Sequence, residues 1–195
     1  RLELKMIADI GIVGVPNAGK SSLLSVVTNA KPKIGNYPFT TLSPNLGVAK
    51  LDVDTVIVLA DIPGLIEGAH QGVGLGFSFL RHIQRTKVLI HVLDGLSEDP
   101  ISDFSQINSE MALFDEKIQD KPQIVAFNKM DLPSVQEKWA EVKSKIKALG
   151  YDILPISTVS HENLDQLMWR AVGLIAEAPE PEPVEVMPVY RASED

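Results

Sequence analysis

Eight residues near the start of the chain have the types and spacing of a phosphate-binding loop. They fit the pattern G-x-x-x-x-G-K-S/T and are Gly14, Val15, Pro16, Asn17, Ala18, Gly19, Lys20 and Ser21. An apolar run at 7–13 precedes them and a helix-compatible run at 22–29 follows, which is the context such a loop requires. There, backbone N–H groups and the helix start would bind phosphate oxygens, Lys20 would reach the β- and γ-phosphates, and Ser21 would ligate Mg²⁺. The alternative is an ordinary glycine turn.

A second segment that could contact the same Mg²⁺ follows the apolar run at 56–60. The sequence there is Asp61-Ile62-Pro63-Gly64. An aspartate that ends a strand in such sheets can hold Mg²⁺ through a water, and the Gly64 N–H could bind the γ-phosphate. The same four residues are also a good turn sequence. Thr41, in an earlier loop, could complete the Mg²⁺ shell while the γ-phosphate is present.

Two later segments have the chemistry to recognise guanine. Residues 123–127 are followed by Asn128-Lys129-Met130-Asp131, in which the carboxylate can accept both N–H donors of guanine at N1 and N2. Adenine lacks that donor pair, so the motif argues against an ATPase that shares the phosphate loop. After residues 153–156, the backbone N–H groups of Ser157-Thr158-Val159 could bind the guanine carbonyl oxygen. A polar turn is the alternative for each segment.

The elements that must position these residues alternate between strand and helix. Apolar runs predict strands at 7–13, 46–51, 56–60, 88–93, 123–127 and 153–156; helices are expected at 77–85, 103–119, 135–149 and 164–177. The alternation predicts an α/β fold: a six-stranded, mainly parallel sheet with helices on both faces. Together with the phosphate-loop and guanine motifs, this order resembles that of a P-loop G domain. Only Asp52-Val53-Asp54 separates the second and third strands, so this pair is expected to be antiparallel at the sheet edge.

Composition sets the class of protein. The 195 residues suit one domain, 1–178, followed by an acidic proline- and glutamate-rich linker, 179–195. A net charge of −8 argues against broad nucleic-acid binding, and the absence of cysteine excludes disulfides and thiolate metal sites. No apolar run is long enough to span a bilayer. We expect the protein to be a monomer. The first residue is Arg1, so we expect a piece of a longer protein.

Two long segments interrupt the alternation, at 31–44 and 64–76, and long loops of this kind are usually functional.

Together the motifs have the order found in translation-factor-like GTPases, over residues 7–177. Residues 37–47 (YPFTTLSPNLG), 61–76 (DIPGLIEGAHQGVGLG) and 79–83 (FLRHI) closely resemble the switch loops of the Obg family.

The resemblance implies the central GTP-binding domain of an Obg-type GTPase. It implies nucleotide contacts from Phe39, Thr40, Thr41, Leu42 and Ser43, with Thr41 rather than Thr40 as the magnesium threonine. It further implies GTP, GDP and ppGpp as ligands, a role in large ribosomal subunit assembly and stress signalling, and flanking domains. The location would be cytoplasmic, or organellar if a transit peptide precedes this segment.

One position departs from Ras-like chemistry. Leu65 stands where those enzymes place a water-orienting glutamine, so hydrolysis must be slow or use other groups. Asn17 offers one route, since related GTPases hold K⁺ near the phosphates through this asparagine. Gln71 or His70 could orient the water instead. A guanine-nucleotide sensor with negligible turnover is the alternative function.

Other polar and aromatic residues have simpler interpretations. His91 lies inside an apolar strand and is expected in the core. Trp139 and Trp169 recur with aliphatic residues at helical spacing and are expected to pack. Asp94 ends a strand, but no matching donor marks it as catalytic.

Overall fold

The computed structural model describes residues 8–28, 33–34, 45–62, 83–114, 118 and 120–178. The elements of these residues follow one another as β1 (Ile10–Val13), α1 (Lys20–Val27), β2 (Lys33–Ile34), β3 (Asn45–Lys50), β4 (Val56–Asp61), β5 (Val88–Asp94), α4 (Pro100–Phe114), β6 (Gln123–Asn128), α6 (Pro133–Ala148), β7 (Asp152–Pro155) and α7 (Leu164–Glu177). Most of the predicted helix at 77–85, the loop at 64–76 and the linker at 179–195 lie outside the described residues.

The strands form one sheet in the order β2-β3-β4-β1-β5-β6-β7. β1 runs parallel to β4 and β5, and β6 runs parallel to β5 and β7. The β3–β4 pair is antiparallel, as the three-residue link predicts, and the α/β fold class is confirmed. β2 adds a seventh strand, antiparallel to β3 at the edge. Two residues are too few to show a strand pattern, so six strands were expected.

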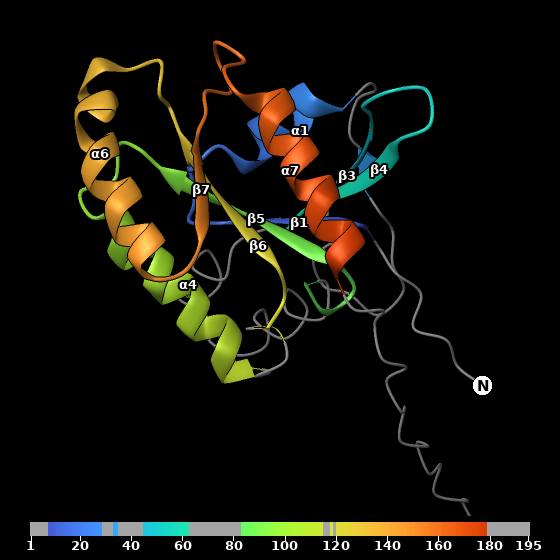
Figure 1. Ribbon diagram of the computed structural model, residues 1–195, viewed down its shortest axis with the longest axis horizontal. Coiled ribbons are helices and arrows are strands. Elements are labelled where there is room, and N and C mark those ends of the chain that lie inside the picture. The colour runs from blue at the N-terminus through green and yellow to red at the C-terminus, as the bar shows by residue number, and fades with distance from the viewer. Residues whose placement is uncertain are drawn as a thin grey trace, which may run out of the picture.

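Helices cover both faces of the sheet. Figure 1 shows α1 and α7 on one side and α4 and α6 on the other. Alternation along β5 explains this arrangement, because Ile90 and Val92 join the core under α1 and α7, whereas Leu89 and Leu93 join the cores under α4 and α6. The parallel strands therefore bring their carboxyl ends together at one edge, where the sequence motifs lie.

Helix boundaries differ from the sequence predictions mainly at prolines. α7 has the predicted bounds, but α4 begins at Pro100 and α6 at Pro133, a few residues earlier than expected. Proline is accepted in the first turn because its missing N–H would have no partner inside the helix. Leu149, the last residue of the helix expected at 135–149, is the C-cap residue of α6 and is 52% exposed.

The two tryptophans differ in their packing. Trp139 stacks on Phe127 with ring centroids 5.9 Å apart, as predicted. Trp169 is 47% exposed, so the expectation that it packs holds for only part of its side chain. No helix in the described part of the chain is long and apolar enough to cross a membrane.

His91 is a fully buried residue of β5, as predicted. Its ring centroid lies 4.7 Å from that of Phe104, and neither ring nitrogen has a hydrogen-bond partner among the described residues. Burial lowers the pKa of His91 to about 3. The imidazole is therefore neutral at physiological pH. Its register partners in the sheet are Val13, the last residue before the phosphate loop, and Val125.

Candidate guanine-nucleotide site

The predicted phosphate loop depends on two glycines that no other residue could replace. Gly14 has φ 149°, and a Cβ there would lie 2.3 Å from the Val92 carbonyl oxygen. Gly19 has φ 101°, and a Cβ there would lie 2.3 Å from Asn128 Nδ2. Both are left-handed conformations that disfavour side chains. The loop backbone therefore lies directly against β5 at one glycine and against the end of β6 at the other.

The loop leads into α1 without a side-chain cap. Gly19 is the N-cap residue of α1, and no side chain of the described residues caps the helix. Lys20, the first residue of α1, is buried, and its Nζ donates to the Val15 carbonyl at 2.9 Å. N–H groups at a helix start bind anions well, and a lysine beside them adds positive charge. The loop can therefore hold phosphate.

Two oxygen-bearing side chains meet beside the loop. The Ser21 hydroxyl donates to Asp61 Oδ2 at 2.5 Å, joining α1 to the end of β4. Asp61 is buried, and its Oδ1 has no hydrogen-bond partner among the described residues. Hydroxyl and carboxylate oxygens suit a hard divalent cation. No group of three His, Cys, Asp or Glu side chains in the described ranges could complete a cage, so such an ion would need phosphate and water oxygens as well.

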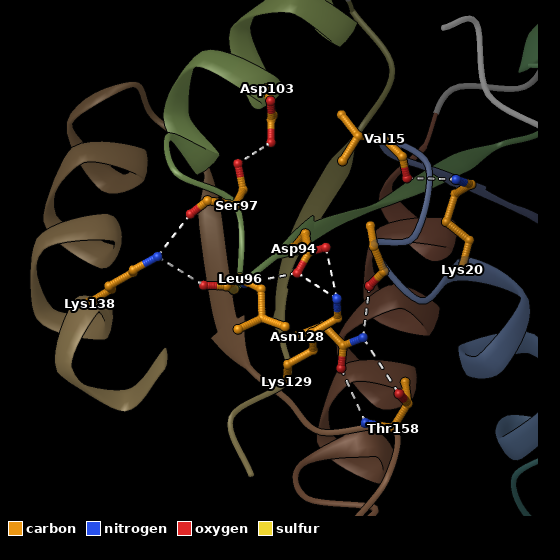
Figure 2. Close-up of polar contacts among 12 residues, drawn as sticks. Val15, Lys20, Asp94, Leu96, Ser97, Asp103, Asn128, Lys129, Lys138 and Thr158 are labelled. Atoms are coloured by element: carbon orange, nitrogen blue, oxygen red, sulfur yellow. Dashed lines mark hydrogen bonds and ion pairs between the residues drawn. The ribbon is translucent and has the colours of Figure 1, made fainter. Parts of the chain in front are cut away.

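Asn128 joins the phosphate loop to the two segments predicted to recognise guanine. This buried residue ends β6, and its Nδ2 donates to the Ala18 carbonyl at 2.8 Å. Its Oδ1 accepts the Thr158 N–H at 3.2 Å, and its Nδ2 lies 3.5 Å from Thr158 Oγ1. Figure 2 shows these contacts converging on the one amide. The structure thus brings together three motifs that are far apart in the sequence.

The Asp131 carboxylate is held by Ser157. The Ser157 hydroxyl is buried and donates to Asp131 Oδ1 at 2.6 Å, while it accepts the N–H groups of Val159 and Ser160 at 3.2 and 3.0 Å. Asp131 itself is exposed. One carboxylate oxygen is thus oriented while the group stays at the surface. The Thr158 N–H already donates to Asn128 Oδ1. To contact a base carbonyl as well, it would have to divide its hydrogen bond between the two oxygens.

The predicted site residues differ in how far they are buried. Ala18, Ile62 and Met130 are buried in the cores, and Val15 and Pro16 are half-buried. Asn17 is exposed and has φ 63°. The remaining predicted site residues lie outside the described part of the chain: Phe39, Thr40, Thr41, Leu42, Ser43, Pro63 and Gly64.

Sequence analysis missed one ion pair at this edge. It found no donor for Asp94, but Lys129 Nζ lies 2.7 Å from Asp94 Oδ1. Asp94 and Asn128 are register partners at the ends of β5 and β6. Only the strand order makes them neighbours, so spacing along the chain could not reveal the pair.

A phosphate loop and a base-recognition loop that share one asparagine are typical of guanine-nucleotide-binding P-loop domains, and the fold and the site place the chain in that class. Comparison with known proteins agrees. The chain belongs to a GTPase family described as "50S ribosome-binding GTPase", whose family model matches residues 9–129.

The predicted resemblance to Obg proteins is also confirmed. The GTPase Obg of Caldanaerobacter subterraneus subsp. tengcongensis is 52% identical, over 100% of this chain and 47% of that protein. The chloroplastic protein OBGC1 of Oryza sativa subsp. indica is 51% identical, over 89% of this chain and 23% of its own. The chain thus spans about half or less of these relatives.

Solved structures show the same fold. Era in a complex with MgGDPNP and a segment of 16S ribosomal RNA superposes with a TM-score of 0.65 at 25% identity, covering 93% of this chain and 60% of that one.

Proposed function

We propose that the chain is a Mg²⁺-dependent GTPase switch domain that binds GTP and GDP and slowly hydrolyses GTP to GDP and phosphate. The observation that carries this proposal is the 2.8 Å hydrogen bond from Asn128 to the Ala18 carbonyl. It fixes the base-recognition loop directly against the phosphate loop. A single nucleotide could therefore contact both.

The two ends of the site would have different tasks. Asp131, oriented by Ser157, would accept the N1 and N2 donors of guanine. Lys20 and the start of α1 would bind the phosphates. Ser21 and Asp61 would hold Mg²⁺, with Thr41 added when the γ-phosphate is present, and bound Mg²⁺ would neutralise charge on the β- and γ-phosphates. The MgGDPNP in the Era structure supports this choice of ion for the present chain.

Hydrolysis transfers the γ-phosphoryl group to water and releases GDP. Leu65 cannot orient that water, so we propose that K⁺ near Asn17 supplies positive charge to the phosphates. Asn17 is exposed at the loop, which leaves its amide oxygen accessible. Its φ of 63° also offers a purely conformational reason for asparagine here. The variant Asn17→Gly distinguishes the K⁺ role from the conformational role, because glycine accepts the same φ but has no side-chain amide.

The test measures phosphate release from GTP with Mg²⁺ in K⁺ and in Na⁺ buffers. We expect faster release in K⁺ for the wild type and no such difference for Asn17→Gly. Equal rates in both buffers for the wild type would contradict the K⁺ role. No release above the uncatalysed rate, with GTP bound, would favour the second candidate: a sensor that responds to GTP, GDP or ppGpp by occupancy alone. Leu65 is the observation that favours the sensor.

We further propose that the parent protein acts on the large ribosomal subunit, as a monomer, in the cytoplasm or in an organelle. The description of the matching family supports the ribosomal partner, and the chloroplastic relative supports the organellar option. Co-sedimentation of the full-length protein with purified large subunits in the presence of GTP would test the partner.

A further inference from the structure

The described sheet ends on one side at β7. β7 is the last strand in its order and pairs there with β6. Figure 1 shows it at the border of the sheet, with α6 on one side of it and α7 on the other. The outer side of such a strand ordinarily presents unpaired N–H and C=O groups, to which a strand of another chain can bond. The partners of these groups therefore decide whether the sheet can be extended.

The hydrogen bonds to β6 show which backbone groups of β7 face outward. Just after β7, the Ile156 N–H donates to the Phe127 carbonyl at 2.8 Å, and the Ile156 carbonyl accepts the Met130 N–H at 3.1 Å. Ile156 thus turns both of its backbone groups toward β6 and the residues that follow it. Because backbone groups alternate between the two sides of a strand, those of Ile153 and Pro155 turn to the outer edge.

The two outward-facing residues of β7 offer an incoming strand no free N–H. The Ile153 N–H donates to Asp152 Oδ1 at 3.1 Å, and Asp152 forms an ion pair with Arg170 of α7. Pro155 has no N–H, and its carbonyl accepts from Asn163 Nδ2 at 2.9 Å. Asn163 has φ 56° and is the N-cap residue of α7, yet its side chain makes no capping bond. Its amide therefore serves the strand edge instead of the helix.

The residues on either side of β7 continue this pattern. The same alternation turns Tyr151 and Ser157 outward, and the N–H of each already has a partner. Tyr151 donates to the Ile146 carbonyl in the last turn of α6 at 3.3 Å, and Ser157 donates to the Glu162 carbonyl at 3.2 Å. From 151 to 157 the outer edge thus offers no free N–H to a partner strand, as far as the structure describes it. A regular ladder needs donors as well as acceptors, so none can form here.

We propose that the outer edge of β7 is closed to strand addition, which prevents a second copy of this chain from joining its sheet to this one. Partners within the chain satisfy backbone groups in any fold, but they require neither a proline nor a left-handed asparagine at the edge. The inference rests on the monomer proposed above and gives it a physical basis. Ser157, which orients Asp131, ends this edge, so an added strand would compete with the bonds that order the base-recognition loop.

The test opens the edge in the full chain with Asp152→Ala, Pro155→Val and Asn163→Gly together. These changes free one N–H, add another and free one carbonyl, while glycine accepts the φ of Asn163. Sedimentation equilibrium then measures self-association of the wild type and of the variant. We expect the wild type to stay monomeric and the variant to form dimers, with a dissociation constant at least about tenfold lower than that of the wild type.

Amide hydrogen exchange shows whether the edge itself is the contact. In the variant, the N–H groups of residues 153 and 155 should exchange more slowly as association proceeds, because they enter a new ladder.

Two further variants keep the test independent of the folding of the triple variant. Pro155→Val alone adds one donor and removes none of the bonds described above, and it should associate more than the wild type but less than the triple variant. Asp52→Ala is the matched control. It removes a carboxylate that accepts the N–H groups of Asp54 and Thr55 in the β3–β4 turn, and it should leave the protein monomeric.

Three results would overturn the inference: monomeric sedimentation of the edge variants while circular dichroism shows them folded, association that leaves exchange at residues 153 and 155 unchanged, or a wild type that dimerises with slowed exchange at residue 153. A wild type that dimerises without that change would contradict only the proposed monomer. Failure of the wild type to bind GDP would contradict only the proposed nucleotide site.

Discussion

The phosphate end and the base end of the site are built by different means. At the phosphate end the backbone does most of the shaping, with Gly14 and Gly19 in left-handed conformations and the loop against β5 and β6. The polar side chains there bond to each other or to the loop itself, as in the Ser21–Asp61 contact. At the base end, side chains such as Asn128 and Ser157 hold the recognition loops through several hydrogen bonds each.

This difference indicates how each end responds to a nucleotide. In the proposed function, Ser21, Asp61 and Lys20 would exchange their present partners for phosphate and metal, so the phosphate end would change on binding. Asp131 is already oriented by Ser157, so the base end is organised beforehand and loses little entropy. Substitutions at the phosphate end should therefore alter the discrimination between GTP and GDP. Substitutions at the base end should weaken the binding of both nucleotides equally.

The largest effect should come from Gly14→Ala, which attacks the backbone design of the phosphate end. The new Cβ would meet the Val92 carbonyl at 2.3 Å, and neither backbone can move without disturbing the sheet. We expect a loss of at least about 3 kcal/mol in the free energy of unfolding, together with loss of nucleotide binding. Urea unfolding would measure the first and fluorescent-nucleotide titration the second. Near-native stability and affinity would show that the loop does not need glycine.

Asn128→Ala breaks the link between the two ends and should have the next largest effect. It removes the donor to the Ala18 carbonyl and the acceptor of the Thr158 N–H. We expect the Kd values of both GTP and GDP to rise by at least about 30-fold. Thr158→Val, which deletes only the weaker contact at 3.5 Å, is the matched control and should change them little. A loss confined to GTP would contradict the assignment of Asn128 to the base end.

Acid should weaken the fold beneath the phosphate loop through His91. The folded protein keeps this residue neutral because burial lowers its pKa to about 3, whereas the unfolded chain protonates it below about 6.5. The unfolded state then binds more protons, so the free energy of unfolding falls as pH drops below about 6.5. Between pH 6.5 and 5 the His91 contribution should be about 2 kcal/mol. His91→Leu should flatten that part of the stability profile, and an unchanged slope would contradict this account.

The smallest effect should come from Gly173→Ala, the control for Gly14→Ala. Gly173 lies within α7, and a Cβ there would meet nothing within 4 Å. We expect a gain of about 0.5–1 kcal/mol in stability and no change in nucleotide affinity, measured as for Gly14→Ala. A loss of affinity would show that glycine substitutions disturb the site regardless of their position.

The sequence predicted what depends on local pattern. The α/β class, the antiparallel β3–β4 pair and the bounds of α7 follow from periodicity and link length. The positions of the phosphate loop and Asn128 after predicted strands place both at one edge of the sheet. The hydrogen bond between them is visible only in the structure. The Asp94–Lys129 pair and the structural role of Met130 depend on strand order and packing, which a single sequence does not encode locally. The predictions for Thr41 and Gly64 remain predictions.

Selection of the base by Asp131 gives the most direct test of the central claim. Titrations should compare GDP, ADP and xanthosine diphosphate for the wild type and for Asp131→Asn, whose amide can donate to the extra carbonyl of xanthine. We expect the wild type to bind GDP far more tightly than the other two, and Asp131→Asn to prefer xanthosine diphosphate. A wild type that binds ADP as tightly as GDP, or an Asp131→Asn variant that keeps its preference for GDP, would contradict the claim that this sheet edge recognises guanine.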